Sequence, residues 1–223
     1  MSMFRNLLVQ AGGGLPATYQ EVEYIQSDGL QYIDTGVTGT SDTTLTATYA
    51  VAGKKDVVAT LIGAEKGFNV TSAATKYYIG VYRVGYSYGY IHMGLTDIAP
   101  FNISGGGQNV KMDLTYDGST LTLKSANNQT TNVSISSSGV VDTELTMTIF
   151  ALNRTVGAST TPEMADRGAL KLYALTISKA GTLVRDFVPC YRKSDNVAGL
   201  YDLVNGVFYT NAGSGTFTVG PDV

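Results

Sequence analysis

Apolar residues recur at every second position along most of this chain. Leu45, Ala47 and Tyr49 alternate with threonines, and Met112 and Leu114 begin a similar run. A period of two is typical of half-buried strands, and no long segment shows the 3.6-residue period of an amphipathic helix. Roughly 13 to 15 short strands separated by turn residues can be assigned in this way. Many short strands without intervening helices predict an all-β fold, here a two-sheet antiparallel jelly-roll sandwich.

The N-terminal residues depart from this pattern. Gly12, Gly13 and Gly14 predict a flexible hinge, which divides the chain into an N-terminal arm (residues 1–14) and a sandwich domain (residues 15–223). The apolar stretch of the arm is too short for a membrane span or a signal peptide, so we expect no membrane association. The i, i+3, i+4 spacing of Phe4, Leu7 and Leu8 would place these side chains on one face of a single helical turn. Such a turn is not stable alone in water, so its apolar face would have to be buried against a partner. We therefore predict docking onto another protein or another copy of this chain through Phe4, Leu7, Leu8 and Val9. The alternative is an irregular N-terminus without a docking role.

Composition excludes several kinds of site. The chain has 223 residues, and its 15 Lys and Arg against 18 Asp and Glu give a net charge of −3. Nucleic-acid backbones are bound by clustered cations, which argues against a nucleic-acid partner. A single histidine (His92) and a single cysteine (Cys190) cannot supply the three or four ligands of a zinc site, nor an intrachain disulfide. We expect Cys190 to be a small core residue.

The segment from Lys76 to Met93 is rich in tyrosine and predicts a hairpin with an aromatic face. A two-residue turn would place Tyr77 opposite His92, whereas a three-residue turn would place Tyr78 there. Tyrosine combines an apolar ring with a hydroxyl group, which suits a sugar ring or a protein partner. The alternative is that the rings fill the core and keep their hydroxyls at its rim. The candidate ligand-binding residues are Tyr77, Tyr78, Tyr82, Tyr86, Tyr88, Tyr90 and His92.

Two stretches resemble a known family. Residues 19–36 read YQEVEYIQSDGLQYIDTG, and residues 181–209 read GTLVRDFVPCYRKSDNVAGLYDLVNGVFY. Both resemble jelly-roll domains of the concanavalin A-like lectin/glucanase type, similar to laminin G-like domains, which recur in phage structural proteins and gut-bacterial surface proteins. The hairpin at residues 112–123, MDLTYDGSTLTL, is similar to the central hairpin of laminin G-like domains. The resemblance covers nearly all of residues 15–223.

The resemblance raises two kinds of chemistry. Glucanases of this fold carry Glu-x-Asp-x-x-Glu on one strand, and this chain has only Glu21 and Glu23 on one strand face. We therefore expect no catalytic residues. Laminin G-like domains often bind Ca²⁺ through loop oxygens, which suit a hard cation. No metal site or cofactor is predicted, because the oxygens available for Ca²⁺ are scattered, and a bound Ca²⁺ stays open as an alternative. The candidates are Asp28, Asp34, Asp97, Asn102 and Asp142.

The resemblance and the arm together imply a non-enzymatic bacteriophage virion protein, such as a fibre, a decoration protein or a tail-tip adhesin. In that role residues 1–14 would hold other virion proteins, and the sandwich would face host-surface glycans. Closed symmetry would make the protein a homo-oligomer, either a trimer or a dimer. Two alternatives stay open: a bacterial surface or secreted carbohydrate-binding module, and a glucanase-like enzyme.

Overall fold

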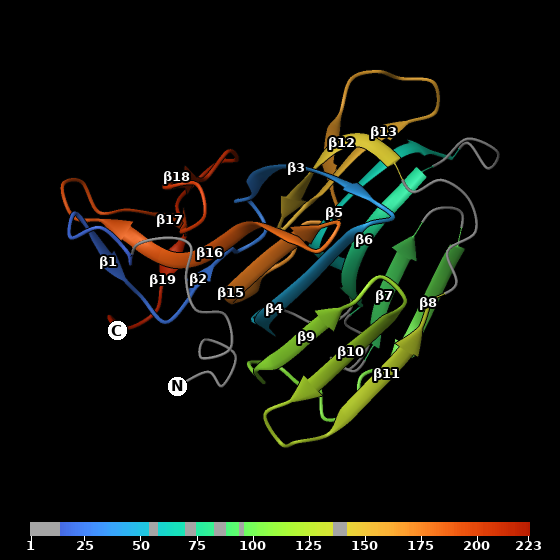
Figure 1. Ribbon diagram of the computed structural model, residues 1–223, viewed down its shortest axis with the longest axis horizontal. Coiled ribbons are helices and arrows are strands. Elements are labelled where there is room, and N and C mark those ends of the chain that lie inside the picture. Colours follow the sequence, from blue (N-terminus) through green and yellow to red (C-terminus); the bar gives the residue numbers. More distant parts are fainter. Residues whose placement is uncertain (1–13, 54–57, 70–74, 83–87, 94–95, 136–141) are drawn as a thin grey trace.

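The computed structural model describes residues 14–53, 58–69, 75–82, 88–93, 96–135 and 142–223. These residues form 19 strands and no α-helix (Figure 1). The part of the chain that the structure describes therefore holds no helix that could cross a membrane. The all-β architecture that the alternation predicts is confirmed.

An 11-stranded sheet forms the larger layer. Its main path runs, in spatial order, through β11 (Thr130–Ser134), β10 (Thr120–Ser125), β9 (Met112–Tyr116), β4 (Thr43–Val51), β15 (Leu170–Lys179), β16 (Thr182–Arg192), β17 (Val197–Asp202) and β18 (Val207–Thr210). Three short strands complete it: β1 (Tyr19–Glu21) pairs with β16, β2 (Ile25–Gln26) with β15, and β19 (Thr218–Val219) with β2. Both ends of the chain sequence thus meet in one sheet, because β1 and β2 join strands from its last quarter.

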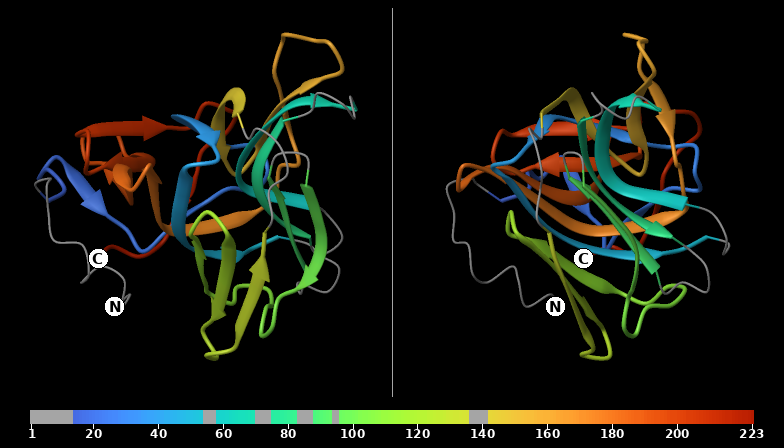
Figure 2. Two further views of the ribbon diagram at one scale, coloured as in Figure 1. Left: turned by 45° about the vertical axis from the view of Figure 1, so that its right-hand side comes forward. Right: turned by 90° about the vertical axis from the view of Figure 1, so that its right-hand side faces the viewer.

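An eight-stranded sheet forms the second layer (Figure 2). Its main path runs through β14 (Glu163–Ala165), β13 (Leu152–Val156), β5 (Val58–Phe68), β6 (Thr75–Tyr82), β7 (Tyr88–Met93) and β8 (Thr96–Asn102), and β12 (Asp142–Ile149) pairs with both β5 and β3 (Ile33–Thr40). Among the described strands, the pairing of β13 with β5 is parallel and the other pairings are antiparallel. The two-sheet antiparallel sandwich is confirmed, with this parallel pair as its exception.

The hydrophobic core lies between the two layers. Side chains that alternate along β4 and β9 point into it, and Leu45, Tyr49 and Leu114 are at most 2% exposed. Tyr77 enters from the opposite sheet, and Gly39 is required beside it because a Cβ there would lie 2.6 Å from the Tyr77 ring. The largest fully buried side chains are Tyr49, Tyr77, Phe150, Phe187, Ile25, Ile33, Leu61, Ile62, Ile79, Ile91 and Leu114.

Candidate functional site

The tyrosine-rich segment forms the hairpin of β6 and β7. Tyr78 pairs with His92 and Tyr82 with Tyr88, which is the register expected of the three-residue turn. Tyr77 consequently points into the core, where its side chain is 1% exposed. Its hydroxyl donates a 3.0 Å hydrogen bond to the carbonyl oxygen of Thr43 in the other sheet. Tyr77 is therefore a core residue that links the two layers.

For the other candidate residues from the sequence, the structure gives a strand position or an exposed fraction at most. Tyr90 lies in β7, opposite Gly80, and His92 is 8% exposed. Tyr86 lies outside the described residues, as do Phe4, Leu7, Leu8 and Val9.

The acidic residues considered for Ca²⁺ have local roles. Asp28, Asp34 and Asp142 each accept a hydrogen bond from the backbone N–H two residues further on, an arrangement that stabilises turns. Asp97 lies in β8, and Asn102 ends that strand with an exposed side chain. Within the described ranges, no group of three or more His, Cys, Asp or Glu side chains could hold a metal ion.

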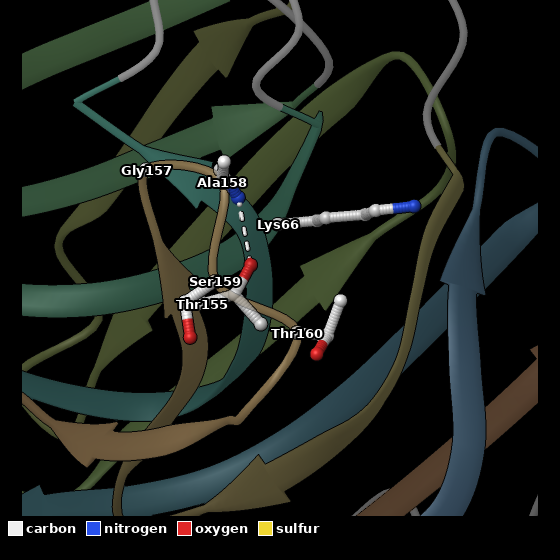
Figure 3. A pocket seen from close by; sticks show the side chains of 7 residues that line it. Lys66, Thr155, Gly157, Ala158, Ser159 and Thr160 are labelled. Carbon is white, nitrogen blue, oxygen red and sulfur yellow. Dashed lines mark hydrogen bonds between the residues drawn. The ribbon is translucent and has the colours of Figure 1, made fainter.

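A small pocket lies where β5 and β13 end, beside the loop after β13 (Figure 3). Its volume is about 160 Å³, and its polar lining includes Thr155, Ser159 and Thr160. Thr155 Oγ1 accepts a 3.0 Å hydrogen bond from Gly67 N–H, so this hydroxyl is already used by the fold. Ligand pockets measure about 300–1,000 Å³, and this one is too small for a typical organic ligand.

The outer face of the 11-stranded sheet is polar along its middle. The register aligns Thr176, Thr46 and Thr115 on adjacent strands, and each is partly exposed. The hydroxyls of Thr46 and Thr176 are 2.7 Å apart, and Thr48 Oγ1 donates a 2.6 Å hydrogen bond to Asp113. Thr46 and Thr176, and Thr48 and Asp113, satisfy one another's hydrogen bonds, so this region has the character of a hydrated face.

Two tyrosines lie at one end of this polar region, and lysines cover them. Lys171 Nζ lies 4.5 Å from the ring centroid of Tyr24, and Lys111 Nζ lies 4.0 Å from that of Tyr173. A Cβ at Gly220 would lie 2.8 Å from the Tyr24 ring, so the C-terminal segment packs against it. Burial is the main cause that raises the pKa of Tyr173 to about 12. The cluster packs the C-terminal segment against the sheet and places a lysine ammonium group over each ring, while both tyrosines stay partly exposed.

A different aromatic cluster lies where β1, β16, β17 and β18 run side by side. The ring centroid of Tyr19 is 4.9 Å from that of Tyr201 and 4.9 Å from that of Phe208. Tyr19 and Phe208 are half-buried, and Val197 beside them is 36% exposed. We call Tyr19, Val197, Tyr201 and Phe208 the aromatic patch.

The aromatic patch lies over buried apolar residues. Pairing along β16 and β17 puts Val188 opposite Tyr201 and Cys190 opposite Gly199, on the same face as the rings. Val188 is 3% exposed and Cys190 is fully buried. The lack of exposed surface confirms the core position expected of Cys190, and burial raises the pKa of its thiol from 9.0 to about 12. The patch is thus the outer layer of a small second core.

A glycine and a buried carboxylate hold the aromatic patch in place. A Cβ at Gly199 would lie 2.2 Å from the carbonyl oxygen of Tyr209 and 3.0 Å from the Phe208 ring, so only glycine lets that ring lie flat. Asp202, with no exposed surface, accepts hydrogen bonds from the backbone N–H groups of Asp186 and Val204 at 3.0 Å each. These contacts fix the β17–β18 hairpin that carries Tyr201 and Phe208.

A charged pair forms the rim of the aromatic patch. Arg192 donates to both carboxylate oxygens of Asp195, at 2.6 Å from Nη2 and 3.1–3.2 Å from Nε. The hydrogen bond from Arg192 is the main cause that lowers the pKa of Asp195. The Arg192 guanidinium also lies 5.7 Å from the ring centroid of Phe208. A central apolar cluster with a polar rim is the usual composition of a protein–protein contact.

Comparison with family models and with curated proteins gives no match. Among solved structures, scytalido-glutamic peptidase with a peptide-based transition-state analogue is similar at a TM-score of 0.36 and 16% identity, over 92% of this chain and 98% of that one. The same peptidase with a transition-state analogue inhibitor gives a TM-score of 0.34 and 16% identity over the same shares. SCP-B, a peptidase of the Eqolisin family in complex with the tripeptide Ala-Ile-His, gives 0.31 and 15%, again over 92% and 98%.

These comparisons correct the function that the sequence resemblance implies. The three structures are of enzymes, and none is a virion protein or a lectin. The prediction of a non-enzymatic bacteriophage virion protein is contradicted by this finding, and we do not carry it further. Because the TM-scores are below 0.5, the similarity also assigns no peptidase activity to this chain.

Proposed function

We propose that this chain is a protein-interaction module that associates with a second copy of itself through the aromatic patch. The observation that carries the proposal is the pair of half-buried rings, Tyr19 and Phe208, packed on the buried Tyr201 ring beside the exposed side chain of Val197. Tyrosine and arginine are enriched among the residues that dominate binding energy, and such residues cluster at the centre of interfaces. The patch combines both, since Arg192 lies at its rim.

The remainder of the same face supports this choice. The threonine hydroxyls at the middle of the sheet bond to one another, and the Tyr24 and Tyr173 rings are covered by lysines. Covering either region would remove bonded hydroxyl groups or lysine ammonium groups from water, which costs free energy. The aromatic patch presents the exposed side chain of Val197 beside its rings, and its geometry is set before binding because Gly199 and Asp202 hold it. A preformed surface loses less conformational entropy on association.

The proposal is tested by measuring the oligomeric state of the full chain. Sedimentation equilibrium from about 1 to 100 µM should show a reversible dimer, which corresponds to roughly −5.5 to −8 kcal/mol of association energy. Val197→Asp places a charge in the patch without disturbing the core and should raise the dissociation constant about tenfold or more. Phe208→Ser should act in the same direction.

The matched control is Val156→Asp, because Val156 is 37% exposed and lies on the other sheet, away from the patch. This variant should leave the dissociation constant within about twofold of the unmodified chain. Circular dichroism confirms that each variant is folded. A chain that stays monomeric throughout the range, or equal effects of Val197→Asp and Val156→Asp, would overturn the proposal.

A further inference from the structure

We infer that the aromatic patch of one copy is covered by the N-terminal arm of a second copy, with Phe4, Leu7 and Leu8 as the groups that reach the rings. This inference rests on the self-association proposed above and names the segment that occupies the site. It follows from the area that the patch offers, from the place where the arm begins and from the residues that the arm carries.

The aromatic patch is too small to hold a complex together alone. A stable interface buries about 800 Å² on each partner. Fully burying an aromatic side chain removes about 150–250 Å² of surface. Tyr201 is already buried, and Tyr19 and Phe208 are half-buried, so the three rings can add only about 200 Å². A flat contact between two such patches therefore buries less area than a stable interface requires. The partner must bring an extended apolar segment that also covers the surroundings of the patch.

The N-terminal arm begins beside the patch. Thr18 accepts a 2.9 Å hydrogen bond from Lys193 N–H, and Tyr19 donates one of the same length to the Pro16 carbonyl oxygen. The first described residue, Gly14, is five positions before Tyr19, so the arm starts within about 17 Å of the patch. In a two-fold complex built around the patches, each arm consequently starts next to the other copy's patch.

The composition of the arm matches that of the patch. Residues 3–9 read MFRNLLV, with one charged side chain and five large apolar ones. The i, i+3, i+4 spacing of Phe4, Leu7 and Leu8 would present these groups together to the rings. Arg5 is the only charge of the arm, and the exposed carboxylate of Asp195 lies at the patch rim. The glycines at positions 12–14 allow the change of direction that an exchange between copies requires.

Disulfide trapping between two single variants tests the exchange. Leu8→Cys and Val197→Cys chains are mixed and oxidised mildly, so that only contact between different copies can yield the mixed covalent dimer. Cys190 is fully buried and does not compete. The control mixture pairs Leu8→Cys with Val156→Cys, because Val156 is as exposed as Val197. We expect at least about tenfold more mixed dimer from the patch pair than from the control pair.

A second measurement uses the full chain without introduced cysteines. Leu7→Asp with Leu8→Asp should weaken self-association as much as Val197→Asp does, whereas Asn6→Asp with Gln10→Asp adds the same charge to the arm and should have less than a twofold effect. Equal yields of mixed dimer from both mixtures would overturn the inference. So would a double variant, Leu8→Cys with Val197→Cys, that forms only the disulfide within one chain. Self-association that survives both arm variants but not Val197→Asp would leave the proposed function standing and refute the arm. A monomeric unmodified chain would refute the proposed function itself.

Discussion

Replacing Asp202 should be among the most destabilising single changes in this chain. Its side chain is fully buried and accepts hydrogen bonds from Asp186 N–H, Val204 N–H and the Asn205 amide, while Arg185 Nε lies 3.7 Å away. Asp202→Ala leaves two backbone N–H groups without an acceptor, at about 1–3 kcal/mol each. Asn205 and Arg185 each keep a carbonyl partner, so their contribution is smaller. We expect a total loss of about 3–5 kcal/mol.

Urea unfolding followed by circular dichroism measures this loss. With a slope of about 2–3 kcal/mol/M, the midpoint should fall by about 1–2 M. Asp202→Asn keeps one acceptor oxygen but turns an amide donor toward Asn205 or Arg185, so it should cost less than Asp202→Ala. The control is Asp222→Ala, because exposed Asp222 has only a 3.5 Å contact from the Tyr191 hydroxyl and should cost under about 0.5 kcal/mol. A loss below about 1 kcal/mol for Asp202→Ala would show that this carboxylate does not organise the hairpin.

Three further predictions concern the two cores. Tyr77→Phe removes the hydroxyl bond to Thr43 and should cost about 1 kcal/mol in urea unfolding; a neutral result would contradict the role of this bond. The Cys190 thiol should stay unreactive toward a thiol reagent at pH 8 until the protein unfolds, and because its folded pKa is raised from 9.0 to about 12, its stabilising contribution is present below pH 9 and lost between pH 9 and 12. Rapid labelling of the folded protein would refute that burial. Gly199→Ala should cost about 3 kcal/mol in thermal unfolding, since its Cβ meets the Tyr209 carbonyl oxygen, whereas Gly14→Ala, with open space around it, should be nearly neutral.

The alternation of apolar and polar residues was enough to predict the fold class, because each strand that buries one face shows this alternation in its own sequence. Leu121 and Leu123 are at most 2% exposed and Thr122 between them is partly exposed, which is the alternation expected of a strand that covers a core on one face. The hairpin of β6 and β7 shows what the alternation cannot predict. Turns of two and three residues both leave an aromatic face, so the pattern alone cannot decide between their registers. The structure decides by placing Tyr77 against Gly39 and Thr43 of distant strands.

The parallel contact of β13 with β5 illustrates a second limit. Asn153 lies opposite Ala64 in this pairing, and these residues are far apart in the sequence. Strand pairing over such a separation depends on how the chain passes between the two sheets, and no local alternation distinguishes a parallel from an antiparallel neighbour. Composition and period therefore predict layers, whereas the order of strands within a layer follows from contacts along the whole chain.

The aromatic patch could not be predicted for the same reason. Tyr19 comes from the first described strand, and Tyr201 and Phe208 come from two of the last, so only the β1–β16–β17–β18 order brings their rings within 4.9 Å. Gly199 and Asp202 stand on either side of Tyr201 in the sequence, and the physical requirement for each is visible only once Phe208 and the hairpin are in place. Val188 and Cys190 are buried on the same face as the rings, and Tyr201 is buried with them, whereas Tyr19 and Phe208 stay partly exposed. A surface that the fold holds rigid but leaves partly exposed stays an energetic gain for whatever covers it, and the apolar arm that begins beside Tyr19 is the segment of this chain with the composition to do so.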